Sequence, residues 1–268
     1  MKEPYIPNLG IEYPDQPDAR MVEVIELREI IFDENYPFLG KTFKFKFLRG
    51  LVYLGIYTVA ALLCFLLYGI KVEGRKNLRK HKKILKNGAM TISNHVHRWD
   101  FIFVAWAVRY HAMFFPAFKE HLKGPDAGWI RHAGGIPVPD DISTMKAFNR
   151  AFDEIHKKKI WMHAFPESTR FNYFVPIRPF KKGVFSMAHK YNLPIIPVAI
   201  SYRKPHFPFT LKKDGKRIPL ITVRVGEPIL FDETLDRKTA VQKMRKECHE
   251  AMIKLAGITN NPYPAEGD

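Results

Sequence analysis

Two residues five positions apart, His95 and Asp100, carry side chains that together can remove a proton from a hydroxyl group. A carboxylate that accepts a hydrogen bond from an imidazole orients the ring and makes it more basic, which suits general-base catalysis near neutral pH. No Ser-x-Gly turn or reactive-cysteine motif flanks the pair, so the hydroxyl is expected to belong to the substrate. The pair therefore predicts attack by a substrate alcohol on an activated carbonyl.

The segments on either side place this pair at the end of a strand. Residues 89–93 are apolar and favour a strand, whereas residues 101–108 form an apolar run typical of a buried helix. Binding groups collect at such strand-to-helix junctions in α/β folds. A step of five residues rotates a side chain by about 140° around a regular helix, so the two side chains can meet only if His95 lies in the preceding turn. That placement also predicts free backbone N–H groups and the positive helix end near the reacting carbonyl oxygen.

Four blocks of sequence follow one another within residues 70–230. They are His95-x-x-x-x-Asp100; Lys119-Glu120 with Gly128-Trp-Ile and Gly134-Gly-Ile-Pro-Val138; Phe165-Pro-Glu-Ser-Thr-Arg170 with Phe180-Lys-x-Gly183; and Leu193-Pro-Ile-Ile-Pro-Val198. In this order and spacing they resemble the glycerolipid acyltransferase family, which includes the 1-acylglycerol-3-phosphate acyltransferases. The resemblance leaves the first fifty or so residues and the last thirty or so unexplained.

The resemblance implies an O-acyltransferase of phospholipid biosynthesis that needs no cofactor. His95 resembles the general base, and Asp100 the residue that holds its tautomer and stabilises the imidazolium. The lysoglycerolipid hydroxyl would attack the thioester of acyl-CoA or acyl-carrier protein directly, without an acyl-enzyme. The acceptor-binding positions of the family correspond to Glu167, Ser168, Thr169 and Arg170. Of these, Arg170 is expected to contact an anionic head group, because a guanidinium can pair with two oxygens.

Two positions depart from the family pattern. Ser168 stands where glycine is usual, which is a mild change because serine is itself a turn residue. Asp140 stands where the family has an arginine that helps hold glycerol phosphate. A carboxylate there would repel a phosphomonoester, so we expect an acceptor with a diester or amine-bearing head group. Other cations that could replace the missing arginine are Arg131, Arg150, Arg178, Lys181 and Lys182.

The charge of the chain favours an anionic partner. The formal net charge is +16 and the pI is near 9.7, which fits a nucleic acid, an acidic lipid surface or the phosphates of coenzyme A. The charge is concentrated in residues 71–86, which hold eight Lys or Arg residues and one Glu. Since this basic segment directly follows an apolar one, we expect an anionic membrane surface and no nucleic-acid partner.

The apolar segment runs from Leu51 to Ile70, twenty residues without a charge. About twenty residues are needed to span a bilayer core as a helix. Basic residues flank both ends, so the positive-inside rule gives no orientation. This symmetry predicts a segment that dips into one leaflet with both ends on the cytoplasmic side, with Gly55 and Gly69 permitting bends. We therefore expect a membrane protein whose active site lies at the cytoplasmic face.

The remaining pattern predicts an α/β fold, a single mixed sheet layered by helices, with an N-terminal membrane-associated helical segment. Apolar runs at 160–165, 195–201 and 221–225 alternate with helical stretches at 143–157, 181–190 and 241–255. The expected divisions are an irregular arm over 1–40, a membrane-embedded or re-entrant helical segment over 41–70, a catalytic domain over 71–260 and a tail over 261–268. The 268 residues can bury one substantial core.

The sequence also leaves two other functions open. The pattern His95-x-His97-x-x-Asp100 resembles a ligand cluster of metal-dependent hydrolases, with His132 or His163 as a further ligand. Its spacing departs by one residue from the usual His-x-His-x-Asp-His and lacks the last histidine, so we expect no metal site. A non-catalytic basic membrane-binding module would explain the charge but not the conjunction of the His/Asp and Phe-Pro-Glu blocks.

Overall fold

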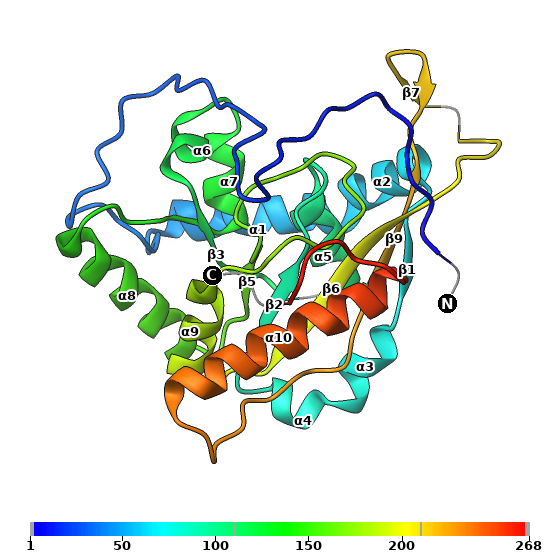
Figure 1. Cartoon of the computed structure of the whole chain (residues 1–268). Helices are drawn as coiled ribbons and strands as arrows, with labels where there is room; N and C mark the ends of the chain where they lie inside the picture. Colours follow the sequence, from blue (N-terminus) through cyan, green and yellow to red (C-terminus); the bar gives the residue numbers. More distant parts are fainter. Residues whose placement is uncertain (1–2, 110, 210, 266–268) are drawn as a thin grey trace.

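A five-stranded mixed sheet lies at the centre of the computed structural model, which describes residues 3–109, 111–209 and 211–265 (Figure 1). The strand order is β1 (Lys71–Glu73), β9 (Leu220–Val225), β6 (Ile195–Arg203), β2 (Met90–Ser93) and β5 (Met162–Ala164). Neighbouring strands are parallel, except that β6 and β9 are antiparallel, pairing from Val198 with Val225 to Arg203 with Leu220. The expected mixed α/β sheet is confirmed.

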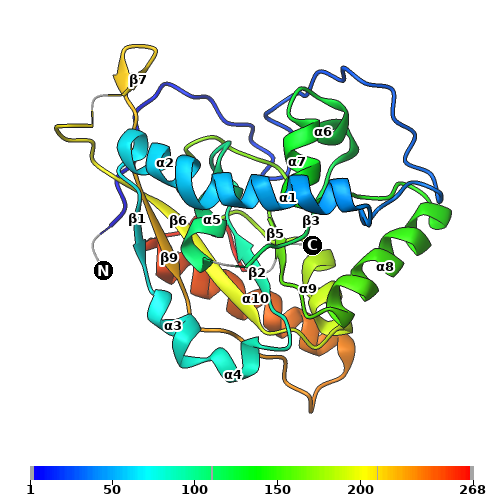
Figure 2. The same cartoon turned by 180° about the vertical axis from the view of Figure 1, so that it is seen from behind.

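Helices cover both faces of the sheet. One face packs against α8 (Ile142–Lys157), α9 (Lys182–Lys190) and α10 (Arg237–Ala256), and the other packs against α5 (Asp100–Val108) (Figures 1 and 2). Because successive side chains of a strand point to opposite faces, Ile195 and Ala199 of β6 join the α8–α10 core, whereas Ile196 and Val198 join the α5 core. Both faces of β6 are therefore buried, as its continuous apolar run predicts.

A continuous helical run lies over α5 on the outside of the molecule (Figure 2). It consists of α1 (Phe43–Gly55), a π-helical segment (Ile56–Ala60) and α2 (Ala61–Tyr68). Gly55 has helical φ and ψ of −59° and −41°, so it does not reverse the chain, whereas Gly69 ends the helix in the left-handed region with φ 52°. The run is therefore continuous, and the chain does not use Gly55 for the bend that this residue would permit.

The basic segment 71–86 is part of the folded domain rather than a separate docking peptide. It forms β1, which pairs with β9, and two short helices, α3 (Arg75–Lys80) and α4 (Lys82–Leu85). The other small elements are α6 (Lys119–Lys123), α7 (Ala127–Ala133), the parallel pair of β3 (Phe115–Ala117) with β4 (Gly135–Pro137), and the hairpin of β7 (Lys212–Lys213) with β8 (Lys216–Arg217).

Residues 3–41, which we call the N-terminal arm, contain no helix or strand. The arm nevertheless lies against the folded domain, crossing the molecule past α6 and α7 before it enters α1 (Figure 1). Its contacts are spread along its length: the Tyr5 N–H donates to the carbonyl of Tyr202, the Tyr13 hydroxyl to that of Asn172, and the Leu27 N–H to that of Lys123.

Candidate active site

The turn between β2 and α5 brings His95 and Asp100 together. The Nδ1 of His95 lies 2.9 Å from Oδ2 of Asp100, which also accepts the backbone N–H groups of Val96 at 2.6 Å and His97 at 2.8 Å. Asp100 is the first residue of α5 and is 1% exposed. Its carboxylate therefore holds the turn that precedes its helix and fixes the imidazole at the same time, and a negative charge is favoured in the first turn of a helix. The approach of the two side chains across the preceding turn is confirmed.

Four backbone donors of this turn are occupied, whereas we expected free N–H groups that face the substrate. The N–H of His95 donates to Glu167, those of Val96 and His97 to Asp100, and that of Trp99 to Nδ1 of His97. The reason is that the acidic side chain at the start of α5 folds back over the turn. These N–H groups are thus unable to stabilise an oxyanion unless the turn rearranges.

His95 presents the Nε2 edge of its ring to the site, because Nδ1 is bound to Asp100. Its ring stacks on Phe165 with centroids 4.0 Å apart and planes 17° apart. Burial lowers the pKa of His95 well below its ordinary value, and the nearby charge of Arg170 lowers it further. Burial raises the pKa of Asp100, whereas the N–H groups of His97 and Val96 oppose that shift. The imidazole is therefore neutral near pH 7, as a general base must be.

Glu167 forms a buried ion pair beneath the turn. Its Oε2 lies 2.9 Å from both the His95 N–H nitrogen and Nη2 of Arg178, and its Oε1 accepts the Arg178 N–H at 2.9 Å. Both side chains are 0% exposed. The Arg178 guanidinium also donates to Thr169 and lies 3.9 Å from the Phe171 ring. Glu167 thus holds the backbone of His95 and does not line the cavity described below.

Ser168 occupies a strained turn position. Its φ is 65°, a left-handed conformation that glycine adopts without strain and other residues adopt at a cost. This explains in physical terms why the family pattern has glycine there. The cavity is lined by the last three residues of this turn, Ser168, Thr169 and Arg170. Nε of Arg170 is buried without a hydrogen-bond partner among the described residues.

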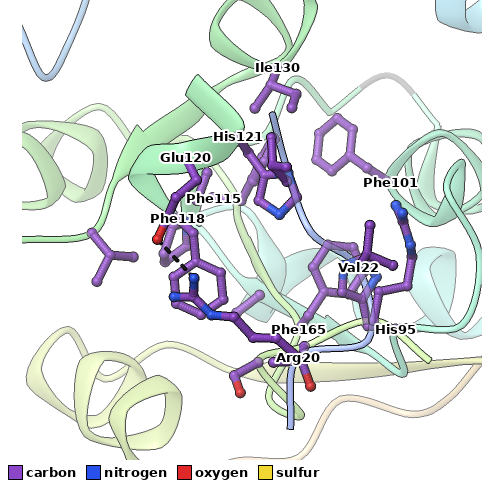
Figure 3. Close-up of a pocket in the computed structure, with 18 of the residues that line it drawn as sticks. Arg20, Val22, His95, Phe101, Phe115, Phe118, Glu120, His121, Ile130 and Phe165 are labelled. Atoms are coloured by element: carbon purple, nitrogen blue, oxygen red, sulfur yellow. Dashed lines mark hydrogen bonds and ion pairs between the residues drawn. The ribbon is translucent and has the colours of Figure 1, made fainter. Parts of the chain in front are cut away.

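A cavity of about 690 Å³ opens in front of His95. Apolar side chains supply much of its wall, including Phe101, Phe115, Trp129, Ile130 and Val138. Its cationic side chains are Arg20, Arg98, Arg170 and Lys181. Figure 3 shows His95 and Phe165 on one side of this space, and Phe118, Glu120 and His121 on another. The polar lining also includes two histidines and two carboxylates, His95 and His121 with Glu23 and Glu120. A largely apolar wall with a group of cations beside His95 suits a lipid substrate that carries an anionic group.

The remaining candidate cations differ in whether they line the cavity. Lys181 lines the cavity and pairs with Asp18 of the arm at 2.7 Å, whereas Lys182 is exposed and outside the lining. Arg131 also lies outside the lining, because its guanidinium donates to the carbonyls of Pro37, Phe38 and Gly135. Of the two other cations considered, Arg150 is exposed on α8 and also outside the lining, and Arg178 is the partner of Glu167.

Asp140 is directed away from the cavity. Its side chain is 76% exposed and pairs with Nζ of Lys119 at 2.7 Å. It is outside the cavity lining, whereas Val138, two residues earlier, is part of it. Our argument that Asp140 repels a phosphomonoester therefore has no support from its position, because the carboxylate is neutralised and solvated.

The histidines considered as metal ligands are used otherwise. His97 accepts the Trp99 N–H and is surrounded by Tyr68, Phe103 and Tyr173. Nδ1 of His163 pairs with the Thr91 hydroxyl at 2.9 Å. Within residues 3–109, 111–209 and 211–265 there is no group of three or more His, Cys, Asp or Glu side chains that could hold a metal ion.

Comparison with known proteins gives this site a family. A family model described as Acyltransferase matches residues 69–201. Over 136 residues the chain is 30% identical to a 1-acyl-sn-glycerol-3-phosphate acyltransferase of Saccharomyces cerevisiae, covering 49% of this chain and 43% of that protein. Over 202 residues it is 28% identical to a protein of the same name from Limnanthes douglasii, covering 73% and 67%. Together these matches support the glycerolipid acyltransferase family for this chain.

Among solved structures, the chain is similar to the 1-acyl-sn-glycerophosphate (LPA) acyltransferase PlsC of Thermotoga maritima, with 20% identity, a TM-score of 0.48, and coverage of 80% of this chain and 84% of that chain. The chain aligns with about half the length of its curated relatives, 43% for the yeast protein and 67% for the plant protein. The family match contains the His95–Asp100 turn and the Glu167–Arg170 turn, but it leaves out the N-terminal arm.

Several residues of the cavity could not be identified from the sequence. Phe165 begins the Phe165–Arg170 block, but nothing in the sequence indicated that its ring stacks on His95. Arg98 stands inside the His95–Asp100 block and lines the cavity while pairing with Asp126. Arg20 and its neighbours in the arm had no motif to mark them, since they are far from the catalytic turns in sequence.

Proposed function

We propose that this protein transfers an acyl group from a thioester, acyl-CoA or acyl-carrier protein, to a hydroxyl of a lysoglycerolipid in phospholipid biosynthesis. The observation that carries the proposal is the neutral His95 imidazole, fixed by buried Asp100 at the edge of an apolar cavity of about 690 Å³. The names of the curated relatives support the same reaction. No cofactor enters it, and the thioester is a co-substrate.

The reaction is a direct displacement. Nε2 of His95 takes the proton of the acceptor hydroxyl as its oxygen bonds to the thioester carbonyl carbon. The tetrahedral oxyanion then collapses, the C–S bond breaks, and the leaving thiolate takes the proton from the imidazolium. Asp100 stabilises the imidazolium between these steps. Since the N–H groups of His95, Val96 and His97 are occupied, we assign stabilisation of the oxyanion to Arg170, which lines the cavity.

The test is transfer of a radiolabelled acyl group from acyl-CoA to lysolipids by the purified chain. We expect His95→Ala to lower kcat by about 10²–10⁴, the usual loss when a general base is removed, and Asp100→Ala to lower it somewhat less. His206→Ala, which changes an exposed histidine outside the cavity lining, is the control. Near-normal turnover by a folded His95→Ala protein would refute the mechanism, and saturating EDTA should change nothing.

We further propose that the helical run of α1 and α2 docks the enzyme on the cytoplasmic face of an anionic membrane. The run Phe43–Tyr68 is long and apolar enough to cross a membrane, since 18 consecutive residues within it have a mean hydropathy of 2.2. Its inner side chains Tyr53, Ile56 and Cys64 pack into the core, while Leu54, Leu62, Phe65 and Leu66 are about half exposed or more. A rod with one face in the protein core and one apolar face outside fits burial in a single leaflet.

Protease protection in sealed vesicles tests the orientation. We expect full digestion of the catalytic domain from the cytoplasmic side. Protection of the catalytic domain from that side would contradict the proposed orientation. We also expect the protein to resist extraction by high salt and to be released by detergent, because buried apolar area is not screened by ions. Quantitative release by salt alone would exclude burial of the helical run in lipid.

A further inference from the structure

The N-terminal arm forms one wall of the substrate cavity. Residues 20–24 line the cavity together with His95, Ser168 and Arg170. Figure 3 shows the arm crossing this space, with Val22 on the side of His95 and Arg20 reaching Glu120 on the neighbouring wall. The arm therefore belongs to the active site, although it has no regular secondary structure and lies outside the family match.

Contacts on both sides of residues 20–24 hold this wall in place. Before them, the Pro17 carbonyl accepts a hydrogen bond from Nη1 of Arg178 at 2.8 Å, and Asp18 pairs with Lys181 at 2.7 Å. After them, Glu26 pairs with Lys123 at 3.0 Å, and the Leu27 N–H donates to the Lys123 carbonyl at 3.0 Å. With both ends fixed to the domain, the intervening side chains are positioned toward the cavity.

Arg20 is the cation that the arm adds to this wall, and Glu23 is the anion. Its Nη1 lies 2.9 Å from Oε1 of Glu120, and its guanidinium carbon lies 5.0 Å from the centre of the Phe118 ring. Its side chain is 59% exposed, so a ligand in the cavity can reach it. Since the bond to Glu120 uses Nη1 alone among the described contacts, the other nitrogens of the fork are available to two oxygens of one anion.

The other cations of the cavity are committed differently. Arg98 donates to both carboxylate oxygens of Asp126 at 2.9 and 2.8 Å. Lys181 is a point charge held by Asp18, and Arg170 lies close enough to His95 to influence its pKa. The block Gly134–Asp140 supplies no cation, because Asp140 replaces the arginine of the family pattern and points outward. An anionic group bound away from the reacting atoms thus has Arg20 as its best placed partner.

We propose that Arg20 recognises a phosphate group of a substrate, and so supplies from the arm the cation that position 140 lacks. The phosphate belongs either to the head group of the acceptor lysolipid or to coenzyme A. This proposal rests on the proposed acyl transfer and identifies one specificity-determining residue for it. It makes the arm a part of substrate selection in this protein.

The experiment compares Arg20→Gln and Arg20→Lys in the full chain with Arg28→Gln, which changes an exposed arginine of the same arm outside the described cavity lining. Acceptors are 1-acylglycerol-3-phosphate and phosphate-free 1-acylglycerol; donors are acyl-CoA and acyl-pantetheine, which lacks the nucleotide phosphates. We expect Arg20→Gln to raise KM for the phosphate-bearing partner about tenfold, the effect of one charge-assisted hydrogen bond, with kcat within about twofold. The KM of Arg20→Lys should lie between those of the wild type and Arg20→Gln, and the KM of Arg28→Gln should match that of the wild type.

The two sources of phosphate give different outcomes. A KM effect confined to 1-acylglycerol-3-phosphate assigns Arg20 to the head group, and one confined to acyl-CoA assigns it to the donor. An unchanged KM, or equal changes with and without phosphate, overturns the proposal. Calorimetric binding of 1-acylglycerol-3-phosphate and of CoA to the same proteins provides a readout without turnover. An inactive wild type would contradict the proposed function, whereas equal binding by wild type and Arg20→Gln would contradict the role of Arg20.

Discussion

Replacing Glu167 by glutamine distinguishes a structural role of this residue from the acceptor-binding role that the family pattern implies. The Glu167 carboxylate accepts hydrogen bonds from the His95 N–H, the Arg178 N–H and the Arg178 guanidinium, each at 2.9 Å. A glutamine amide has one oxygen in place of two and adds an NH₂ that faces donors. The change also leaves the fully buried guanidinium of Arg178 without a counter-charge.

The expected loss of stability is large because the Glu167–Arg178 ion pair is buried away from water. Breaking a buried ion pair by removing one partner costs about 3–5 kcal/mol, a substantial part of the 5–15 kcal/mol or so that stabilises a typical protein. We expect Glu167→Gln to lower the free energy of unfolding by this amount and to lower kcat, because the His95 backbone loses an acceptor. Denaturant titration in detergent, followed by tryptophan fluorescence, measures the first effect, and steady-state transfer assays measure the second.

The control is Glu154→Gln, the same chemical change in a surface carboxylate that pairs with Lys158 and Lys41; it should cost less than about 1 kcal/mol. The double variant Glu167→Gln with Arg178→Met removes both charges, so its loss should be smaller than the sum of the single losses. Unchanged stability of Glu167→Gln together with a raised KM for the acceptor would refute this reasoning. That result would mean that the carboxylate faces the substrate.

Three further predictions follow from the same structure. Burial lowers the pKa of His97 and of His163 to about 3, so below about pH 6.5 the unfolded chain binds protons that the folded protein excludes. The free energy of unfolding should therefore fall between pH 7 and pH 5, by up to about 2 kcal/mol per histidine. Equal denaturation midpoints at the two pH values would contradict this prediction. Leu62→Ser with Leu66→Ser, on the exposed face of α2, should weaken sedimentation with anionic vesicles by about 100-fold or more, whereas Ile142→Ser with Met145→Ser, exposed on α8, should not. Asp140→Arg should change the relative kcat/KM for phosphomonoester and diester acceptors by less than about threefold, because Asp140 is in a solvated surface pair; a larger shift would return Asp140 to the acceptor site.

The elements with strong local patterns could be predicted from the sequence. The apolar runs predicted β2, β5, β6 and β9, and the helical stripe predicted α10, which is capped by Asp236 at its start and by Gly257, with φ 79°, at its end. β1 was not predicted, because Lys71 and Glu73 belong to the basic segment that we expected at an anionic membrane surface. Its pairing with β9 joins residues about 150 positions apart, and no local pattern reports such a contact.

Sequence spacing located the two turns of the candidate site but not the direction of each side chain. The His95–Asp100 pair could be predicted because both residues lie in one turn, where five positions restrict their geometry. For Glu167 the spacing fixed the turn and left open whether the carboxylate faces the cavity or the core. Its buried partner Arg178 decides this, and a cation eleven positions away has no distinctive pattern. The same limit explains why we considered Arg131 together with Lys181 as a candidate anion-binding cation. The structure shows that Arg131 instead donates hydrogen bonds to carbonyls near the end of the arm.

The Glu167–Arg178 pair also connects the catalytic turn to the N-terminal arm. Arg178 donates to the Pro17 carbonyl of the arm, while its partner Glu167 accepts the N–H of His95. The arm therefore depends on a side chain that also supports His95, the proposed general base. The cavity wall at residues 20–24 begins three residues beyond that contact. Loss of Arg178 should for this reason disturb both the backbone of His95 and the position of Arg20. A substitution of Arg20 itself leaves the buried pair intact, so Arg20→Gln can separate substrate recognition from the architecture that holds the base.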